Sequence, residues 1–504
     1  MVSTLPLISS IELPSGAKYE QPLGLFIDNE FVKPVSTAGK GEKLITVNPS
    51  TGKPITEVYC ASEKDVDVAV KAANKAMETW KSVEPTVRVE LLLKLADLVD
   101  EHTQTLAAIE ALDSGKPLNS NAMADVESVA SYLRYCAGWA DKLHGKQIPI
   151  SSTCMAITKR VPLIVGCIVP WNYPISMASW KFCPALAAGC TIVMKSSEIT
   201  PLSLLYFAQL VKLAGFPPGV FNVLSGYGKD VGSAISRHPG LGKVAFTGST
   251  LTGKKVMADA ANSNLKSVSL ECGGKSPLIV FEDADLKECA KWASFGVMYN
   301  TGQNCTANSR ILVDEKIFDS FLKIFLGQLK KDWKLGNVFS ESTTMGPVVS
   351  QQQYDRVQSY IKIGVEEGAT LHQPLLDTTP SAGFYISPSV FTNVKEDMRI
   401  VKEEIFGPVV TISKFSTESE AVKKANDTIY GLAAMIFTTN FERANRVADQ
   451  VEAGSIYLNS SNNEDVRVPF GGMKMSGIGR ELGEEAFNLY TVSKSIYYNY
   501  GSKL

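Results

Sequence analysis

Three residues, each close to the end of an apolar segment, could take part in covalent chemistry. Cys305 ends the polar segment Asn300-Thr-Gly-Gln-Asn-Cys305, where a thiol is either a nucleophile or a small buried hydrophobe. Glu271 precedes a Gly-Gly pair, and a carboxyl group in apolar surroundings is either a general base or structurally inert. Asn172 could donate to an oxyanion or cap a turn. Each residue taken singly leaves both interpretations open.

Two further segments could bind phosphate and ribose. Phe246-Thr-Gly-Ser-Thr250 joins a β-rich run to a helical one, so its backbone N–H groups and helix N-terminus could receive a phosphate. Met194-Lys-Ser-Ser-Glu198 ends another run with a cation and a carboxylate, and a carboxylate there suits a ribose diol. Gly226-x-Gly228 is a weak signal alone, because such glycine pairs are frequent in loops.

The elements that must position these residues read as two α/β lobes that meet near residue 272. Short apolar runs alternate with helical segments, which is typical of parallel sheets with crossover helices. The runs of the first lobe are Leu163–Val169, Thr191–Met194, Phe221–Leu224, Lys243–Phe246 and Ser267–Leu270. Those of the second are Pro277–Phe281, Arg310–Val313, Val409–Ile412 and Ser455–Leu458.

The flanking segments predict a hairpin, long helices and two edge strands. Phe26–Val32 alternates around an Asp-Asn turn, and helical periodicity fills much of Glu63–Ala137, beginning near a capping box at Ser62. Lys146–Arg160 and the aromatic-rich Tyr490–Tyr500 read as edge strands. They form either an ordinary surface hairpin and tail or a sheet that joins subunits.

Composition excludes several classes of function. The 504 residues carry 50 basic and 52 acidic side chains without a long basic run, which argues against nucleic-acid binding. The sequence has no run of about 18 apolar residues, the length that would predict a membrane span. The segment Met1–Gly16 lacks the Lys or Arg of a secretory or mitochondrial leader. Nine scattered cysteines and four histidines show no metal-ligand spacing, so no metal is expected. Ser502-Lys503-Leu504 matches the signal read by the peroxisomal import receptor, which predicts a peroxisomal protein, with the cytoplasm as the alternative.

Taken together, the segments resemble the aldehyde dehydrogenase superfamily from about Gly24 to Tyr498. Glu271 in Leu-Glu-Cys-Gly-Gly-Lys and Cys305 in Gly-Gln-Asn-Cys reproduce the family's two active-site segments, 34 positions apart. The resemblance implies that Cys305 is the nucleophile, that Glu271 activates hydrolytic water, and that Asn172 and the Cys305 backbone N–H donate to the oxyanion. In this chemistry a thiolate adds to an aldehyde, hydride leaves for a nicotinamide, and water releases an acid from the thioester.

The resemblance also implies a site for NAD. Because the Glu198 carboxylate can accept bonds from both ribose hydroxyls and would repel a 2′-phosphate, NAD is expected in preference to NADP. Phe406 is expected to pack near the nicotinamide. The expected cofactor-binding residues are Lys195, Glu198, Trp171, Gly228, Ser249, Gly248, Glu404 and Phe406.

Four aromatic residues match positions that line the family's aldehyde tunnel: Tyr173, Trp180, Tyr299 and Phe470. An aromatic box suits a cation, so betaine aldehyde or an ω-aminoaldehyde is the first expected substrate. Tyr299 and Phe470 depart from the tryptophans usual in those enzymes, and a general aliphatic or fatty aldehyde is the alternative. Transfer of the acyl group to coenzyme A is disfavoured by the presence of Glu271. Intact Cys305, Glu271 and Asn172 disfavour a catalytically silent binding or structural relative.

The resemblance implies three structural parts. Residues 1–142 and 162–273 are expected to form a Rossmann-like NAD-binding domain, and residues 274–475 a second α/β, catalytic domain. Residues 143–161 and 476–504 are expected to form a small β oligomerisation element and the C-terminal tail. The expected assembly is a homodimer or homotetramer.

Overall fold

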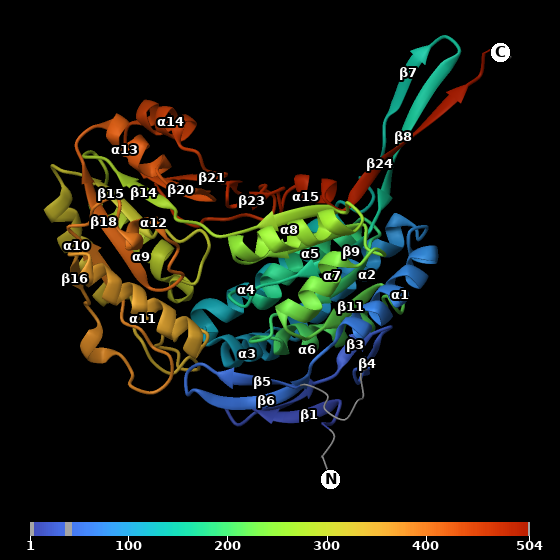
Figure 1. The fold of residues 1–504 in the computed structure, drawn as a ribbon, viewed down its shortest axis with the longest axis horizontal. Helices are drawn as coiled ribbons and strands as arrows, with labels where there is room; N and C mark the ends of the chain where they lie inside the picture. The colour runs from blue at the N-terminus through green and yellow to red at the C-terminus, as the bar shows by residue number, and fades with distance from the viewer. Residues whose placement is uncertain (1–4, 36–42, 502–504) are drawn as a thin grey trace.

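The computed structural model describes residues 5–35 and 43–501, and within them two large sheets are flanked by helices (Figure 1). The chain has the predicted α/β fold, with the two lobes and the small β element that the sequence predicts. The eight-stranded sheet of the first lobe has the order β23 (Gly477–Ile478), β13 (Ser267–Glu271), β12 (Lys243–Thr247), β9 (Ile164–Ile168), β10 (Thr191–Lys195), β11 (Phe221–Leu224), β3 (Leu25–Ile27) and β4 (Glu30–Val32).

The five central strands of this sheet run parallel, as predicted. β9 pairs with β10 on one side and with β12 on the other, so strand order reverses between β9 and β12. The register sets Ile168 beside Lys195 and Phe246, and the carboxyl ends of all three strands therefore share one edge. A crevice outside such a reversal is where open α/β sheets bind ligands.

Helices cover both faces of the first sheet because their apolar sides are buried against it. The capping box predicted at Ser62 is present, and it begins a helix whose buried residues recur at helical spacing. The predicted hairpin turn has Asp28 and Asn29 at positive φ. The helices of this lobe are α1 (Glu63–Trp80), α2 (Pro85–Glu101), α3 (Thr103–Ser114), α4 (Met123–Ala137), α5 (Pro174–Ala187), α6 (Leu202–Ala214), α7 (Ser233–Arg237) and α8 (Thr250–Ser263).

The second lobe is a seven-stranded sheet with its own buried core. Its order is β16 (Thr370–His372), β17 (Ser389–Thr392), β18 (Val409–Phe415), β15 (Arg310–Asp314), β14 (Pro277–Val280), β20 (Ala433–Phe437) and β21 (Ser455–Leu458). The helices around it include α9 (Leu286–Met298), α10 (Phe318–Asp332), α11 (Gln351–Glu366), α13 (Glu418–Asn426) and α14 (Phe441–Gln450).

A three-stranded arm extends away from the body of the first lobe (Figure 1). It consists of β7 (Gln147–Ser151), β8 (Cys154–Pro162) and β24 (Thr491–Asn499), in the order β24-β8-β7. The two segments predicted as edge strands therefore pair with each other through β8. Both outer strands of the arm leave an edge without a partner among the described residues.

The predicted boundary at residue 476 is too early, because residues 476–490 belong to the first lobe. β23 adds antiparallel to β13, and Tyr490 is fully buried. Gly477 has a φ of 141°, and a Cβ there would lie 1.9 Å from the Leu270 carbonyl oxygen, so glycine permits this close pairing. The arm proper starts only at β24.

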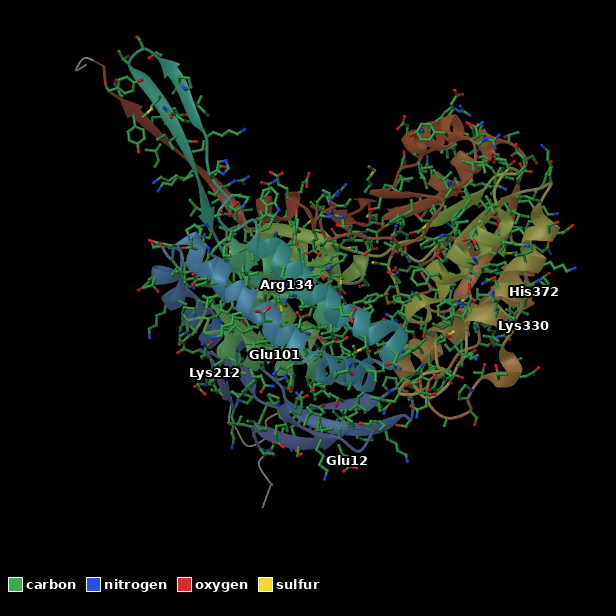
Figure 2. The ribbon with its side chains drawn as sticks, turned by 180° about the vertical axis from the view of Figure 1, so that it is seen from behind. Glu12, Glu101, Arg134, Lys212, Lys330 and His372 are labelled. Atoms are coloured by element: carbon green, nitrogen blue, oxygen red, sulfur yellow. The ribbon has the colours of Figure 1, made fainter. Side chains whose placement is uncertain are left out.

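A membrane-crossing helix and a metal-binding cluster are both absent from the part of the chain that the structure describes. Within 5–35 and 43–501, none of the helices combines the length and apolar character that a membrane crossing requires, and no cluster of His, Cys, Asp and Glu could hold a metal. His372 lies in the second lobe (Figure 2), where its Nε2 is 3.0 Å from Thr392 Oγ1. The signal Ser502-Lys503-Leu504 lies outside the described residues.

Candidate active site

The loop that carries Cys305 is held in an unusual backbone conformation. After α9 ends at Met298, Asn300, Thr301 and Gly302 have φ angles of 51°, 57° and 70°. Left-handed backbone is costly for residues other than glycine and persists only where surrounding contacts stabilise it. Gln303 supplies such contacts: its Nε2 donates to Asn300 O at 3.2 Å, and its Oε1 accepts from Val349 N at 2.9 Å.

Asn172 lies against this loop. It follows β9, and its Nδ2 donates to the Gln303 carbonyl oxygen at 3.0 Å. In return Asn300 Nδ2 donates to the Asn172 carbonyl oxygen at 2.9 Å. An amide nitrogen carries two hydrogens, so the side chain of Asn172 keeps one for a ligand.

The Gly273-Gly274 pair brings the loop after β13 into contact with two other segments. A Cβ on Gly273 would lie 2.2 Å from Glu404 Oε2, and a Cβ on Gly274 would lie 2.2 Å from the Cys305 carbonyl oxygen. A side chain at position 274 is therefore excluded by the backbone of Cys305, and a side chain at position 273 would displace the Glu404 carboxyl group. The two glycines bring Glu404 and the Cys305 loop close to the end of β13.

A first cavity of about 520 Å³ lies outside the carboxyl ends of β9 and β12. Trp171 and Phe406 meet edge to face in its wall, with ring centroids 5.3 Å apart. Glu404 Oε1 accepts a bond from Gly274 N at 2.9 Å, and burial raises the pKa of this carboxyl to about 7. Of the expected cofactor-binding residues, Trp171, Gly248, Ser249, Glu404 and Phe406 line this cavity, together with Asn172 and Cys305.

The N-terminus of α8 opens into the first cavity. Ser249 is its N-cap and accepts a bond from Thr252 N at 3.2 Å, while Ser249, Thr250 and Leu251 all line the wall. A Cβ on Gly248 would lie 2.6 Å from the Phe246 ring. The first-turn N–H groups of a helix form a site for an anionic group, and the cavity therefore fits the phosphates of a dinucleotide.

Lys195, Glu198 and Gly228 form a neighbouring cluster and are absent from the lining of the first cavity. Lys195 Nζ lies 3.0 Å from Glu198 Oε2 at the carboxyl end of β10. Burial alone would raise the pKa of Glu198, but the Lys195 charge and hydrogen bonds bring it below its usual value. The carboxylate is ionised and partly exposed, as contact with a ribose requires.

A second cavity of about 310 Å³ lies on the other side of Cys305. All four aromatic residues expected in the aldehyde tunnel line it: Tyr173, Trp180, Tyr299 and Phe470. Trp180 and Phe470 meet edge to face, with centroids 5.0 Å apart. Cys305 lines both cavities, so one thiol stands between a site that fits a dinucleotide and an aromatic tunnel.

The Cys305 thiol is protonated in this resting arrangement. Burial raises its pKa well above the usual range, and the negative charges of Glu464, Glu404 and Glu271 raise it further. A thiolate is the reactive form. The Cys305 thiol must therefore lose its proton before it reacts.

Glu271 lies outside the lining of both cavities, although its neighbours Cys272 and Gly273 line the first. Both carboxyl oxygens are buried and have no hydrogen-bond partner among the described residues. Burial raises the pKa of Glu271 well above its usual range, Glu481 adds to the rise, and Lys181 and Arg480 oppose it. The Glu271 carboxyl group is therefore buried beside the first cavity rather than exposed to it.

Three charged residues near the site were not predicted from the sequence: Lys181, Glu481 and Glu464. Lys181 is buried, pairing with Glu481 Oε1 at 2.7 Å and donating to Thr247 Oγ1 at 2.6 Å. Glu464 lines the second cavity with Cys305. Lys181 and Glu481 are 300 positions apart, and no local pattern of residues could have paired them.

The comparisons with known proteins agree with this fold and site. The sequence profile of the aldehyde dehydrogenase family matches residues 36–496, and the chain belongs to that family. An aldehyde dehydrogenase-like protein of Schizosaccharomyces pombe is 53% identical over 99% of both chains. Aldehyde dehydrogenase [NAD(P)+] 1 of Saccharomyces cerevisiae is 48% identical over 98% of both. The NAD+ complex of an aldehyde dehydrogenase from Bacillus cereus superposes with a TM-score of 0.91 at 45% identity, over 95% of this chain and 96% of that one.

Proposed function

We propose that the chain oxidises an aldehyde to a carboxylic acid with NAD, through a thiohemiacetal and then a thioester on Cys305. The observation that carries the proposal is the position of Cys305 in the walls of both cavities. Asn172 and the Cys305 backbone N–H stabilise the oxyanion that forms when sulfur adds to the carbonyl carbon. Glu271 then takes a proton from the water that hydrolyses the thioester.

The first cavity has residues suited to NAD. Its phosphates fit the N-terminus of α8 at Ser249, and Glu404 and Phe406 lie where the nicotinamide end would reach Cys305. When bound, NAD supplies the acceptor for the hydride that leaves the thiohemiacetal. Bacillus cereus aldehyde dehydrogenase, a structural neighbour, has an NAD+ complex.

NAD is proposed in preference to NADP because Glu198 would repel a 2′-phosphate. The name of the Saccharomyces cerevisiae relative includes both cofactors. Titration of each cofactor into the unaltered chain and into Glu198→Gln measures the preference. The substitution should improve NADP binding relative to NAD, and an unchanged ratio would argue against this role for Glu198.

Substitution of Cys305 by alanine tests the reaction. Cys305→Ala should abolish NADH formation while NAD binding, measured by titration calorimetry, persists. Cys154→Ala is the matched control because Cys154 is a partly exposed free thiol on the arm strand β8. Normal turnover by Cys305→Ala would refute the mechanism, and loss of turnover in both variants would point to general damage.

For the substrate, we propose betaine aldehyde or an ω-aminoaldehyde, with a general aliphatic or fatty aldehyde as the alternative. The aromatic residues of the second cavity support the cationic aldehydes. Rates of NADH formation with betaine aldehyde, 4-aminobutyraldehyde and hexanal separate the two classes. A faster reaction of hexanal would make the chain a general aliphatic aldehyde dehydrogenase.

Two further proposals concern the assembly of the chain and its location in the cell. The open edges and exposed apolar residues of the arm support assembly into a homodimer or homotetramer. Ser502-Lys503-Leu504 supports delivery by the peroxisomal import receptor. A fluorescent protein fused at the N-terminus should mark peroxisomes only when these three residues end the chain. A cytoplasmic signal from the intact fusion would argue against import.

A further inference from the structure

The lining of the second cavity contains more acidic than basic residues. Its described lining contains three acidic residues, Asp125, Glu464 and Asp465, and no Lys, Arg or His. Asp125 pairs with the buried Lys116, whose Nζ lies 2.5 Å from Asp125 Oδ2 and 3.6 Å from Glu110 Oε2. Asp465 pairs with Arg467 at 2.8 Å. Glu464 has no ion-pair partner among the described residues. Burial raises the pKa of its carboxyl group to about 7, so the group is partly ionised near neutral pH and a bound cation would favour its charged form.

A hydrogen bond holds the carboxyl group of Glu464, and its charge affects the pKa values of residues around Cys305. The Tyr457 hydroxyl, on β21, donates a hydrogen bond to it. Its negative charge contributes to the raised pKa values of Cys305, Tyr173 and Tyr299. The carboxylate therefore belongs to the same electrostatic environment as the nucleophile and the aromatic wall.

We propose that Glu464 determines specificity by pairing with the positively charged end of an aldehyde whose carbonyl group reaches Cys305. The inference rests on the proposed function of this cavity and identifies one residue that selects the substrate. Tyr173, Tyr299 and Trp180 line the same space, and aromatic rings attract an ammonium group. The Nζ of Lys116 already lies 4.5 Å from the centroid of the Tyr173 ring. An anionic aldehyde meets repulsion without a compensating cation, and a neutral aldehyde gains nothing from Glu464.

A pair of aldehydes with the same shape isolates the charge. Betaine aldehyde and 3,3-dimethylbutanal differ mainly in having nitrogen or carbon at the branched centre, so only the first carries a positive charge. The kcat/KM ratio of the two is measured for the unaltered enzyme, Glu464→Gln and Glu464→Asp. We expect Glu464→Gln to lower the ratio about tenfold, chiefly through the KM of betaine aldehyde. Glu464→Asp should retain part of the preference.

Asp465→Asn is the matched control, since Asp465 lines the same cavity next in sequence but already has its cation. Its ratio should stay within about twofold of the unaltered enzyme's. Equal loss of both substrates in Glu464→Gln, or an unchanged ratio, would overturn the inference. Oxidation of 3,3-dimethylbutanal alone would overturn it and leave the proposed function standing, whereas oxidation of no aldehyde, hexanal included, would overturn both.

Discussion

At the scale of single residues, the state of Glu271 sets an expectation for pH. Burial, then Glu481, raise the pKa of its carboxyl group, so the group gains base character as pH rises through the raised value. Thioester hydrolysis should therefore accelerate with pH, and Glu271→Gln should slow it and flatten the profile. Stopped-flow measurement of NADH gives the burst and the steady state at each pH.

The burst provides the control for this prediction, because its rate reports on Cys305 rather than on water activation. The pKa of Cys305 is also raised by burial, so the burst rate should rise with pH in the unaltered enzyme and in Glu271→Gln alike. A steady-state rate that still rises steeply in Glu271→Gln would show that another group activates water.

Several residues that the sequence singled out within local motifs lie together in the structure. Cys305, Asn172 and the glycines of Gly273-Gly274 meet as the segments indicated, and the four tunnel aromatics share one cavity. The sequence did not predict the position of Glu271 outside both cavities or the pairing of Lys181 with Glu481. Side-chain direction and long-range charge pairs depend on tertiary packing, which no local spacing encodes.

At the scale of elements, we expect alanine substitutions at two glycines to have opposite effects on stability. Gly302 lies in the loop between α9 and Cys305, and Gly327 lies on α10. Gly302 has a φ of 70°, and a Cβ there would lie 2.2 Å from the Gly407 carbonyl oxygen. Gly302→Ala should cost about 1–3 kcal/mol or more of stability and lower kcat by moving Cys305. Gly327→Ala, on α10 with open space around it, should instead stabilise by about 0.5–1 kcal/mol. Urea unfolding and turnover measure both, and equal effects would contradict the argument.

A second expectation at this scale concerns the buried cation that joins α3, α4 and α5. Lys116 Nζ lies 2.5 Å from Asp125 and 3.6 Å from Glu110, and Glu110 accepts a bond from Ile175 N. Lys116→Met leaves two buried carboxyl groups uncompensated, so unfolding free energy should fall by about 3–5 kcal/mol. Burial already raises the pKa of both carboxyl groups, and Lys116 opposes that rise.

Loss of Lys116 should therefore raise both pKa values further. Protonation then removes the buried charges, so the destabilisation should shrink as pH falls and grow as pH rises through the raised values. Urea unfolding of Lys116→Met across a pH series measures this dependence. The double substitution Lys116→Met with Asp125→Asn should recover part of the stability, and a pH-independent loss would mean that packing dominates.

At the scale of the whole molecule, the alternation of apolar runs and helices predicted nine strands of the two large sheets, whereas β16, β17 and β20 of the second lobe match no predicted run. β9, β10, β12 and β13 each match a predicted run closely, because buried parallel strands are continuous apolar segments. The boundary at residue 476 was wrong because a two-residue strand, β23, carries no such signal. Its pairing depends on Gly477 meeting Leu270, a contact that the sequence does not reveal.

The arm supplies the last expectation, because it exposes apolar side chains on strands with free edges. Ile150 is 52% exposed and Tyr497 is 70% exposed, and such a surface is stable in water when a second copy covers it. Ile150→Lys combined with Tyr497→Lys should shift sedimentation equilibrium toward the monomer. Phe441→Lys is the control, since Phe441 is 78% exposed on α14 of the other lobe and should leave assembly unchanged. An oligomer that survives the arm substitutions, or one that Phe441→Lys dissociates, would place the interface elsewhere on the molecule.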